Sequence, residues 1–180
     1  MTLALRPHPR LPAGPAIAVG SHAARPTPDR LELRYVVTGD LGALYLPPAG
    51  HPARADELWK RTCFEAFVRP AAGEAYFEFN FAPTRWWAVY RFDRYREGMA
   101  DAEITPALIE AHTSGERFEL TVAVDLPGWT ATRPWRLGLT AVIEELNGEK
   151  SYWALAHAPG KPDFHHPDSF AYDLSPAEPA

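Results

Sequence analysis

The residues best suited to chemistry lie in two short segments between Trp59 and residue 81. In residues 75–81, Tyr76, Glu78 and Asn80 alternate with alanine and phenylalanines. Because successive side chains of a β-strand point to opposite faces, the polar groups fall on one face and the apolar groups on the other. Residues 63–68 alternate similarly, with Glu65 opposite the apolar face. The pattern predicts a sheet with one apolar face and one face that can form hydrogen bonds.

This combination suits the binding of a sugar or a similar polar molecule. A sugar ring offers flat C–H patches and a ring of hydroxyls, which aromatic surfaces and planar carboxyl or amide groups recognise with little loss of rotamer entropy. We therefore expect Trp59 to stack on a ligand and Glu65, Glu78 and Asn80 to bind its hydroxyls. The alternative is that Trp59 plugs one end of the core and that the two carboxylates pair with arginines.

A third segment, residues 85–96, interleaves arginines with aromatic residues. Arg91 or Arg96 could orient the two acids or reach an acidic sugar. The same pattern could form a stacking platform for bases or a strand with solvated arginines. The net charge of -5 argues against nucleic acid as a partner.

Histidines and aromatic residues gather near the C-terminus. His157, His165, His166 and Asp163 lie within ten residues, which invites a metal hypothesis. Adjacent His165 and His166 on an extended segment point to opposite sides, so at most one of them serves a given ion. We therefore predict no metal site and expect these histidines to form hydrogen bonds in a loop.

The sequence offers fewer residues suited to catalysis than to binding. Glu65 and Glu78 could act as a glycosidase pair, but the sequence does not indicate a raised pKa for either. Cys63 lies mid-strand without an activating base, which favours a buried, inert thiol. The phosphate loop, the zinc-protease helix and the nucleophile elbow are all missing from the sequence. The sequence favours a non-catalytic binding protein over an enzyme.

Composition predicts an all-β fold that positions these residues. The chain has 180 residues, of which 46% are hydrophobic, and its 19 prolines and 12 glycines favour short strands joined by turns. Clear period-two alternation occurs at residues 31–37, 118–124 and 137–143. We predict about nine or ten strands with little helix, in a β-sandwich; a closed barrel would show the same local pattern.

The expected organisation is one domain at residues 31–175, preceded by an extended segment with one possible edge strand at residues 1–30 and followed by a tail at 176–180. A single cysteine excludes an internal disulfide. Pro7 interrupts any signal-peptide pattern, and no apolar run approaches the roughly 20 residues that span a bilayer. A cytoplasmic protein without membrane partners is the default expectation, and the oligomeric state stays open.

Three motifs carry a family resemblance. Residues 59–68 read WKRTCFEAFV, residues 76–80 read YFEFN, and residues 163–170 read DFHHPDSF. Together they resemble the DOMON-like domains related to family 9 carbohydrate-binding modules, over roughly residues 30–175. A group of small bacterial proteins with LWKxTCFExF and KPDFHH patterns is closer still.

The resemblance implies a jelly-roll-like sandwich of two antiparallel sheets and a glycan ligand held between two aromatic residues. Trp59 matches the first tryptophan and Glu65 the nearby carboxylate, whereas Trp153 and Phe164 are both candidates for the second aromatic residue. Calcium or haem is the possible cofactor; for haem, Met99 would pair with His165 or His157. The complete predicted ligand-binding set is Trp59, Glu65, Tyr76, Glu78, Asn80, Arg91, Arg96, Trp153, Phe164 and His165.

Overall fold

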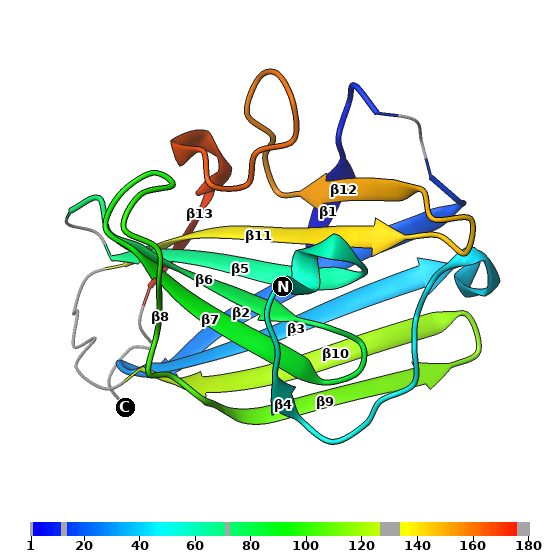
Figure 1. The fold of residues 1–180 in the computed structure, drawn as a ribbon, viewed down its shortest axis with the longest axis horizontal. Coiled ribbons are helices and arrows are strands. Elements are labelled where there is room, and N and C mark those ends of the chain that lie inside the picture. The colour runs from blue at the N-terminus through cyan, green and yellow to red at the C-terminus, as the bar shows by residue number, and fades with distance from the viewer. Residues whose placement is uncertain (1, 12–13, 71–72, 127–133, 176–180) are drawn as a thin grey trace.

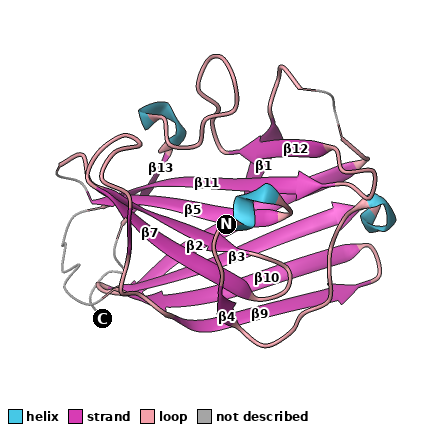
Figure 2. Ribbon diagram, viewed as in Figure 1, coloured by secondary structure: helices cyan, strands magenta, loops and turns pink. Residues whose placement is uncertain are grey.

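The computed structural model describes residues 2–11, 14–70, 73–126 and 134–175, and within them the chain is all-β with almost no helix (Figures 1 and 2). Within these ranges, three short 3-10 helices interrupt the strands: η1 (Leu41–Ala43), η2 (Leu58–Lys60) and η3 (Pro167–Ser169). The described residues contain thirteen strands: β1 (Leu3–Pro7), β2 (Ile17–Thr27), β3 (Arg30–Gly39), β4 (Ala53–Arg54), β5 (Cys63–Pro70), β6 (Tyr76–Phe81), β7 (Trp86–Phe92), β8 (Ala100–Asp101), β9 (Pro106–Ser114), β10 (Arg117–Asp125), β11 (Trp135–Glu144), β12 (Lys150–Ala154) and β13 (Tyr172–Leu174).

The strands form one strongly curled, mixed sheet. Its order is β4-β7-β6-β5-β11-β12-β1-β2-β3-β10-β9, with β8 beside β7 and β13 beside β11. The prediction of two separate antiparallel sheets is not confirmed, because β1 joins the halves: Leu3–Leu5 pair with β2, while Arg6 and Pro7 pair with β12. The β4–β7 pair is parallel. The strand count exceeds the prediction partly because two-residue strands such as β4 and β8 leave no readable alternation.

The main core lies between the two halves of the curled sheet. Phe64 of β5 is fully buried and stacks on Phe118 of β10, with ring centroids 5.4 Å apart. Tyr35 of β3 also packs on Phe64, with ring centroids 5.3 Å apart. The predicted apolar faces of residues 64–68 and 77–81 do point into this core. Alternation in these strands therefore determines which side chains remain for the other face.

A second, smaller cluster covers that other face of β5, β6 and β7. It includes Phe67 and Tyr76 from the sheet and Phe164 and Phe170 from the segment between β12 and β13. That segment is drawn in orange in Figure 1 and rises beside β11. It gives the sheet an incomplete cover, and the candidate site lies beneath it.

Residues 1–30 supply β1 and β2, and β2 lies inside the sheet between β1 and β3. The tail predicted at residues 176–180 lies outside the described residues. Within the described part of the chain, no helix has the length and apolar character needed to cross a membrane.

Candidate functional site

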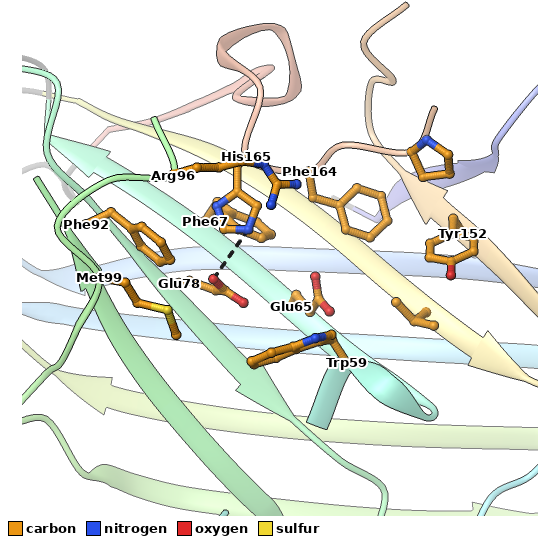
Figure 3. Close-up of a pocket in the computed structure, with 12 residues that line it drawn as sticks. Trp59, Glu65, Phe67, Glu78, Phe92, Arg96, Met99, Tyr152, Phe164 and His165 are labelled. Carbon is orange, nitrogen blue, oxygen red and sulfur yellow. Dashed lines mark ion pairs between the residues drawn. The ribbon is translucent and has the colours of Figure 1, made fainter. Parts of the chain in front are cut away.

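A cavity of about 370 Å³ opens on the outer face of β5 and β6 (Figure 3). Its floor is acidic and its walls are mostly aromatic. In the view of Figure 3, the two carboxyl groups lie between the Trp59 indole on one side and the His165 and Phe164 rings on the other. The lining residues are Trp59, Glu65, Phe67, Glu78, Phe92, Arg96, Met99, Val142, Tyr152, Pro162, Phe164 and His165.

Trp59 stands at the edge of the cavity on η2. Glu57, which precedes this helix, adopts a left-handed φ of 60°, and this turn presents the indole to the sheet. The Trp59 ring is half-buried and meets the Tyr90 ring edge-on at 5.9 Å. Trp59 packs against the smaller cluster on this face of the sheet and not against the main core, so the alternative that it fills one end of the core holds only for the smaller cluster.

Glu65 and Glu78 form the floor of the cavity from neighbouring strands. Glu65 lies opposite Asn80 in the β5–β6 pair, and Glu78 lies opposite Phe67, so the two acids are diagonal neighbours on one face. Glu65 is only 2% exposed to solvent, and Glu78 is only 5% exposed. Such burial is costly for a charged group, so the partners of each oxygen matter.

The carboxyl groups are only partly satisfied by hydrogen bonds. Thr140 Oγ1 donates to Glu65 Oε2 at 3.2 Å, and Asn80 Nδ2 donates to Glu78 Oε1 at 2.8 Å. Glu65 Oε1 is buried and has no hydrogen-bond partner among the described residues. Neither acid forms an ion pair with an arginine in the described ranges, so the arginine-pairing alternative is also wrong.

Burial raises the pKa of Glu65 well above its usual range, and the neighbouring Glu78 charge raises it further. Burial also raises the pKa of Glu78 to about 7, against the opposing effects of the Asn80 hydrogen bond and the Arg96 charge. Two neighbouring buried carboxyl groups disfavour simultaneous ionisation, so the pair favours states in which one of them keeps its proton.

His165 closes one side of the site through a short hydrogen-bond chain. The Tyr76 hydroxyl accepts a bond from the Arg96 backbone N–H at 3.2 Å and lies 2.7 Å from His165 Nδ1. Donation from Tyr76 to Nδ1 assigns the ring proton to Nε2, which lies 3.7 Å from Glu78 Oε2. Burial, followed by the Arg96 charge, lowers the pKa of His165 to about 4, so the ring is neutral at physiological pH.

Arg96 braces the segment that covers the site. Its backbone is left-handed, with φ 55°, and its guanidinium donates to Asp163 Oδ1 at 2.8 Å. The Tyr95 hydroxyl donates to the other Asp163 oxygen at 2.5 Å, and the His165 backbone N–H donates to Oδ1 at 3.2 Å. The turn after β7 therefore positions Phe164 and His165 through Asp163.

The structure brings together most of the residues singled out in the sequence. Trp59, Glu65, Glu78, Arg96, Phe164 and His165 line the cavity. Tyr76 and Asn80 lie behind it as hydrogen-bond partners of His165 and Glu78.

Arg91 and Trp153 do not reach the cavity. Arg91 is exposed, pairs with Asp93 and borders a different surface depression. Trp153 is buried in the main core, where its Nε1 donates to Ser151 Oγ at 2.9 Å. Each assignment is wrong by one strand position: the neighbours Phe92 and Tyr152 line the cavity instead.

Sequence reasoning missed several apolar residues of the site. Phe67 and Phe92 could have been found by extending the alternation of Glu65 and Tyr90 along their strands. Tyr152, Val142 and Pro162 reach the cavity through the pairing of β11 with β12 and the course of the following loop, which no local pattern reports.

The site does not fit the cofactors that the resemblance implies. Met99 and His165 both line the cavity, but His165 Nδ1 bonds to Tyr76 and Nε2 lies 3.7 Å from Glu78 Oε2, so each ring nitrogen already faces a polar group of the protein. His157 Nε2 bonds to the Arg6 carbonyl, and His157 is not among the described residues that line the cavity with Met99. Among the described residues, no group of three or more histidine, cysteine, aspartate or glutamate side chains is placed to hold a metal ion.

Gly138 of β11 allows the covering segment to approach the sheet. It lies opposite Phe67, and a Cβ at this position would be 2.9 Å from the Ser169 carbonyl oxygen. We expect Gly138→Ala to push η3 away and to reduce the free energy of unfolding by about 1–3 kcal/mol in urea denaturation. Gly42→Ala is the control, since its Cβ would meet only the Asp40 side chain at 3.4 Å. Equal stability of the two variants would contradict this account.

No protein-family model matches the sequence, and no curated protein is significantly similar to it. The fold is similar to the crystal structure of a protein from Bacteroides uniformis ATCC 8492 that is provisionally described as carbohydrate-binding, with a TM-score of 0.64. The alignment has 14% sequence identity and covers 97% of this chain and 84% of that chain. At this identity the likeness establishes a shared fold alone.

Proposed function

We propose that the protein is a non-catalytic binding module for a small carbohydrate or a similar polar molecule, held in the cavity over β5 and β6. The observation that carries the proposal is the buried Glu65 carboxyl group, which lines an aromatic-walled cavity and has an oxygen without a hydrogen-bond partner among the described residues. A buried polar atom in this state gains free energy when a ligand supplies its missing bond. The carbohydrate-binding description of the fold neighbour agrees with this proposal.

The site provides separate surfaces for the two parts of a sugar. Trp59 and Phe164, on opposite sides of the carboxyl groups, offer rings for the C–H patches of a pyranose. Glu65 and Glu78 offer planar oxygens for its hydroxyls. The cavity volume of about 370 Å³ lies at the small end of the range for ligand sites, which favours one sugar unit over an extended chain.

The principal test is Trp59→Ala against a monosaccharide panel in isothermal titration calorimetry. We expect the affinity to fall about 30-fold or more, because a tryptophan that anchors a ligand typically contributes 2 kcal/mol or more. The thermal midpoint should change by only a few degrees, since the indole is half-buried and outside the main core.

Trp86→Ala is the matched control, because Trp86 is 46% exposed on β7 and is not among the residues that line the cavity. This variant should bind as the unmodified protein does. Unfolding of the Trp59→Ala variant, or equal binding by both variants, would contradict the stacking role.

A glycoside hydrolase is the second candidate, favoured by the raised pKa values of two neighbouring carboxyl groups. Chromogenic glycosides would reveal such an activity. Turnover that disappears in both Glu65→Gln and Glu78→Gln would replace the binding proposal with a catalytic one.

A further inference from the structure

The floor of the cavity is acidic, but its surroundings contain little free positive charge. Arg96 is the one arginine or lysine among the described lining residues, and its guanidinium is bonded to Asp163. His165, the remaining basic group, is neutral because burial lowers its pKa to about 4. Burial raises the pKa of Glu78 and the Arg96 charge opposes that rise, but neither acid forms an ion pair with an arginine or lysine among the described residues.

Hydroxyl groups of a neutral ligand could complete the hydrogen bonds of these acids, but they would not relieve the cost of burying the charge. A positively charged N–H group can both donate hydrogen bonds to the carboxyl groups and offset their buried negative charge. Its attraction to each carboxylate favours the ionised form. The remaining walls suit a cation as well. Trp59, Phe67, Phe92 and Phe164 present aromatic rings, whose faces attract ammonium groups.

We infer that the ligand carries a protonated amine, which lies over Glu65 and Glu78 between the aromatic walls, and that the natural ligand class is an amino sugar. This inference rests on the proposed function and deepens it. The amine donates to the Glu65 and Glu78 carboxyl groups, while the ring of the sugar stacks on Trp59. Its three N–H donors are enough for one bond to each carboxyl group and one further contact.

The test compares D-glucosamine, D-glucose, N-acetyl-D-glucosamine and n-butylamine by isothermal titration calorimetry at pH 7. We expect glucosamine to bind at least tenfold more tightly than glucose or N-acetylglucosamine, which match its ring but lack the charge. Glu78→Gln should abolish this preference, whereas Glu149→Gln, a change at an exposed position in the β11–β12 turn, should retain it. Circular dichroism would verify that each variant is folded.

The outcomes separate the inference from the function on which it rests. Equal affinities for glucose and glucosamine would overturn the amine inference and leave carbohydrate binding in place. Binding of butylamine alone, with dependence on Glu78, would support amine recognition and overturn carbohydrate as the ligand class. Absence of binding by all four compounds would overturn both.

Discussion

Glu78→Gln is expected to make the protein more stable than the unmodified chain, by an amount that grows as the pH rises. Burial raises the pKa of Glu78 from its ordinary value of 4.5 to about 7. Between these values the folded state binds a proton that the unfolded state has released, so the stability of the unmodified protein falls with rising pH. Glutamine has no proton to lose, and Asn80 can still donate to its amide oxygen.

The difference between the two proteins should be small at pH 4.5, grow by up to about 1.4 kcal/mol per pH unit and level off above pH 7 at on the order of 3 kcal/mol. The pKa of His165 is lowered, so its contribution to stability is lost as the pH falls from 6.5 towards 4, in the opposite sense. The His165 contribution is present in both proteins, so it largely cancels when their free energies of unfolding are subtracted.

Urea denaturation at pH 4.5, 5.5, 6.5 and 7.5 would measure this effect. Glu149→Gln again serves as the control, because it removes an exposed carboxylate of the same kind. A stability difference that stays constant across the series would contradict the prediction, because it would show that folding does not change the pKa of Glu78.

Phe64→Ala is expected to cause the largest loss of stability, about 3–5 kcal/mol. Phe64 is fully buried where the two halves of the curled sheet meet, between Phe118 of β10 and Tyr35 of β3. Removal of its ring leaves a cavity between strands that cannot close together without breaking the pairing of β5 with its neighbours.

A double-mutant cycle with Phe118→Ala would measure the contact itself. We expect a coupling free energy of about 0.5–1.5 kcal/mol for this stacked pair. Leu146→Ala, at a side chain that is 68% exposed, should change the stability by less than about 0.5 kcal/mol. Additive losses for Phe64 and Phe118 would contradict direct packing across the core.

Most residues of the site could be predicted from the sequence because side chains alternate between the two faces of a β-strand. Once residues 63–68 and 75–81 are taken as strands, Glu65 and Glu78 must lie on the face opposite Phe64 and Phe79, and the structure confirms this. The same rule explains the two misplaced residues. Arg91 and Trp153 were assigned by residue type, and a shift of one position on a strand moves a side chain to the other face.

The sequence did not reveal how the sheet closes. The curling depends on β1, a five-residue strand whose first half pairs with β2 and whose second half pairs with β12, about 150 residues away. No local pattern encodes a pairing over such a separation. A sandwich of two sheets and a curled sheet joined through one strand have the same alternation and the same apolar faces.

Sequence alone was sufficient to predict the all-β class, the apolar and polar faces of β5 and β6 and the kinds of group that line the site, because alternation and side-chain chemistry are local properties. The complete fold was needed to show that Glu65 and Glu78 are buried, that His165 is neutral and that Trp59 lies outside the main core. Burial and pKa depend on residues up to about 90 positions away, such as Thr140 and His165, which reach the site through strand pairing and a loop. That is why the sequence predicted the chemistry of the site but not its electrostatics.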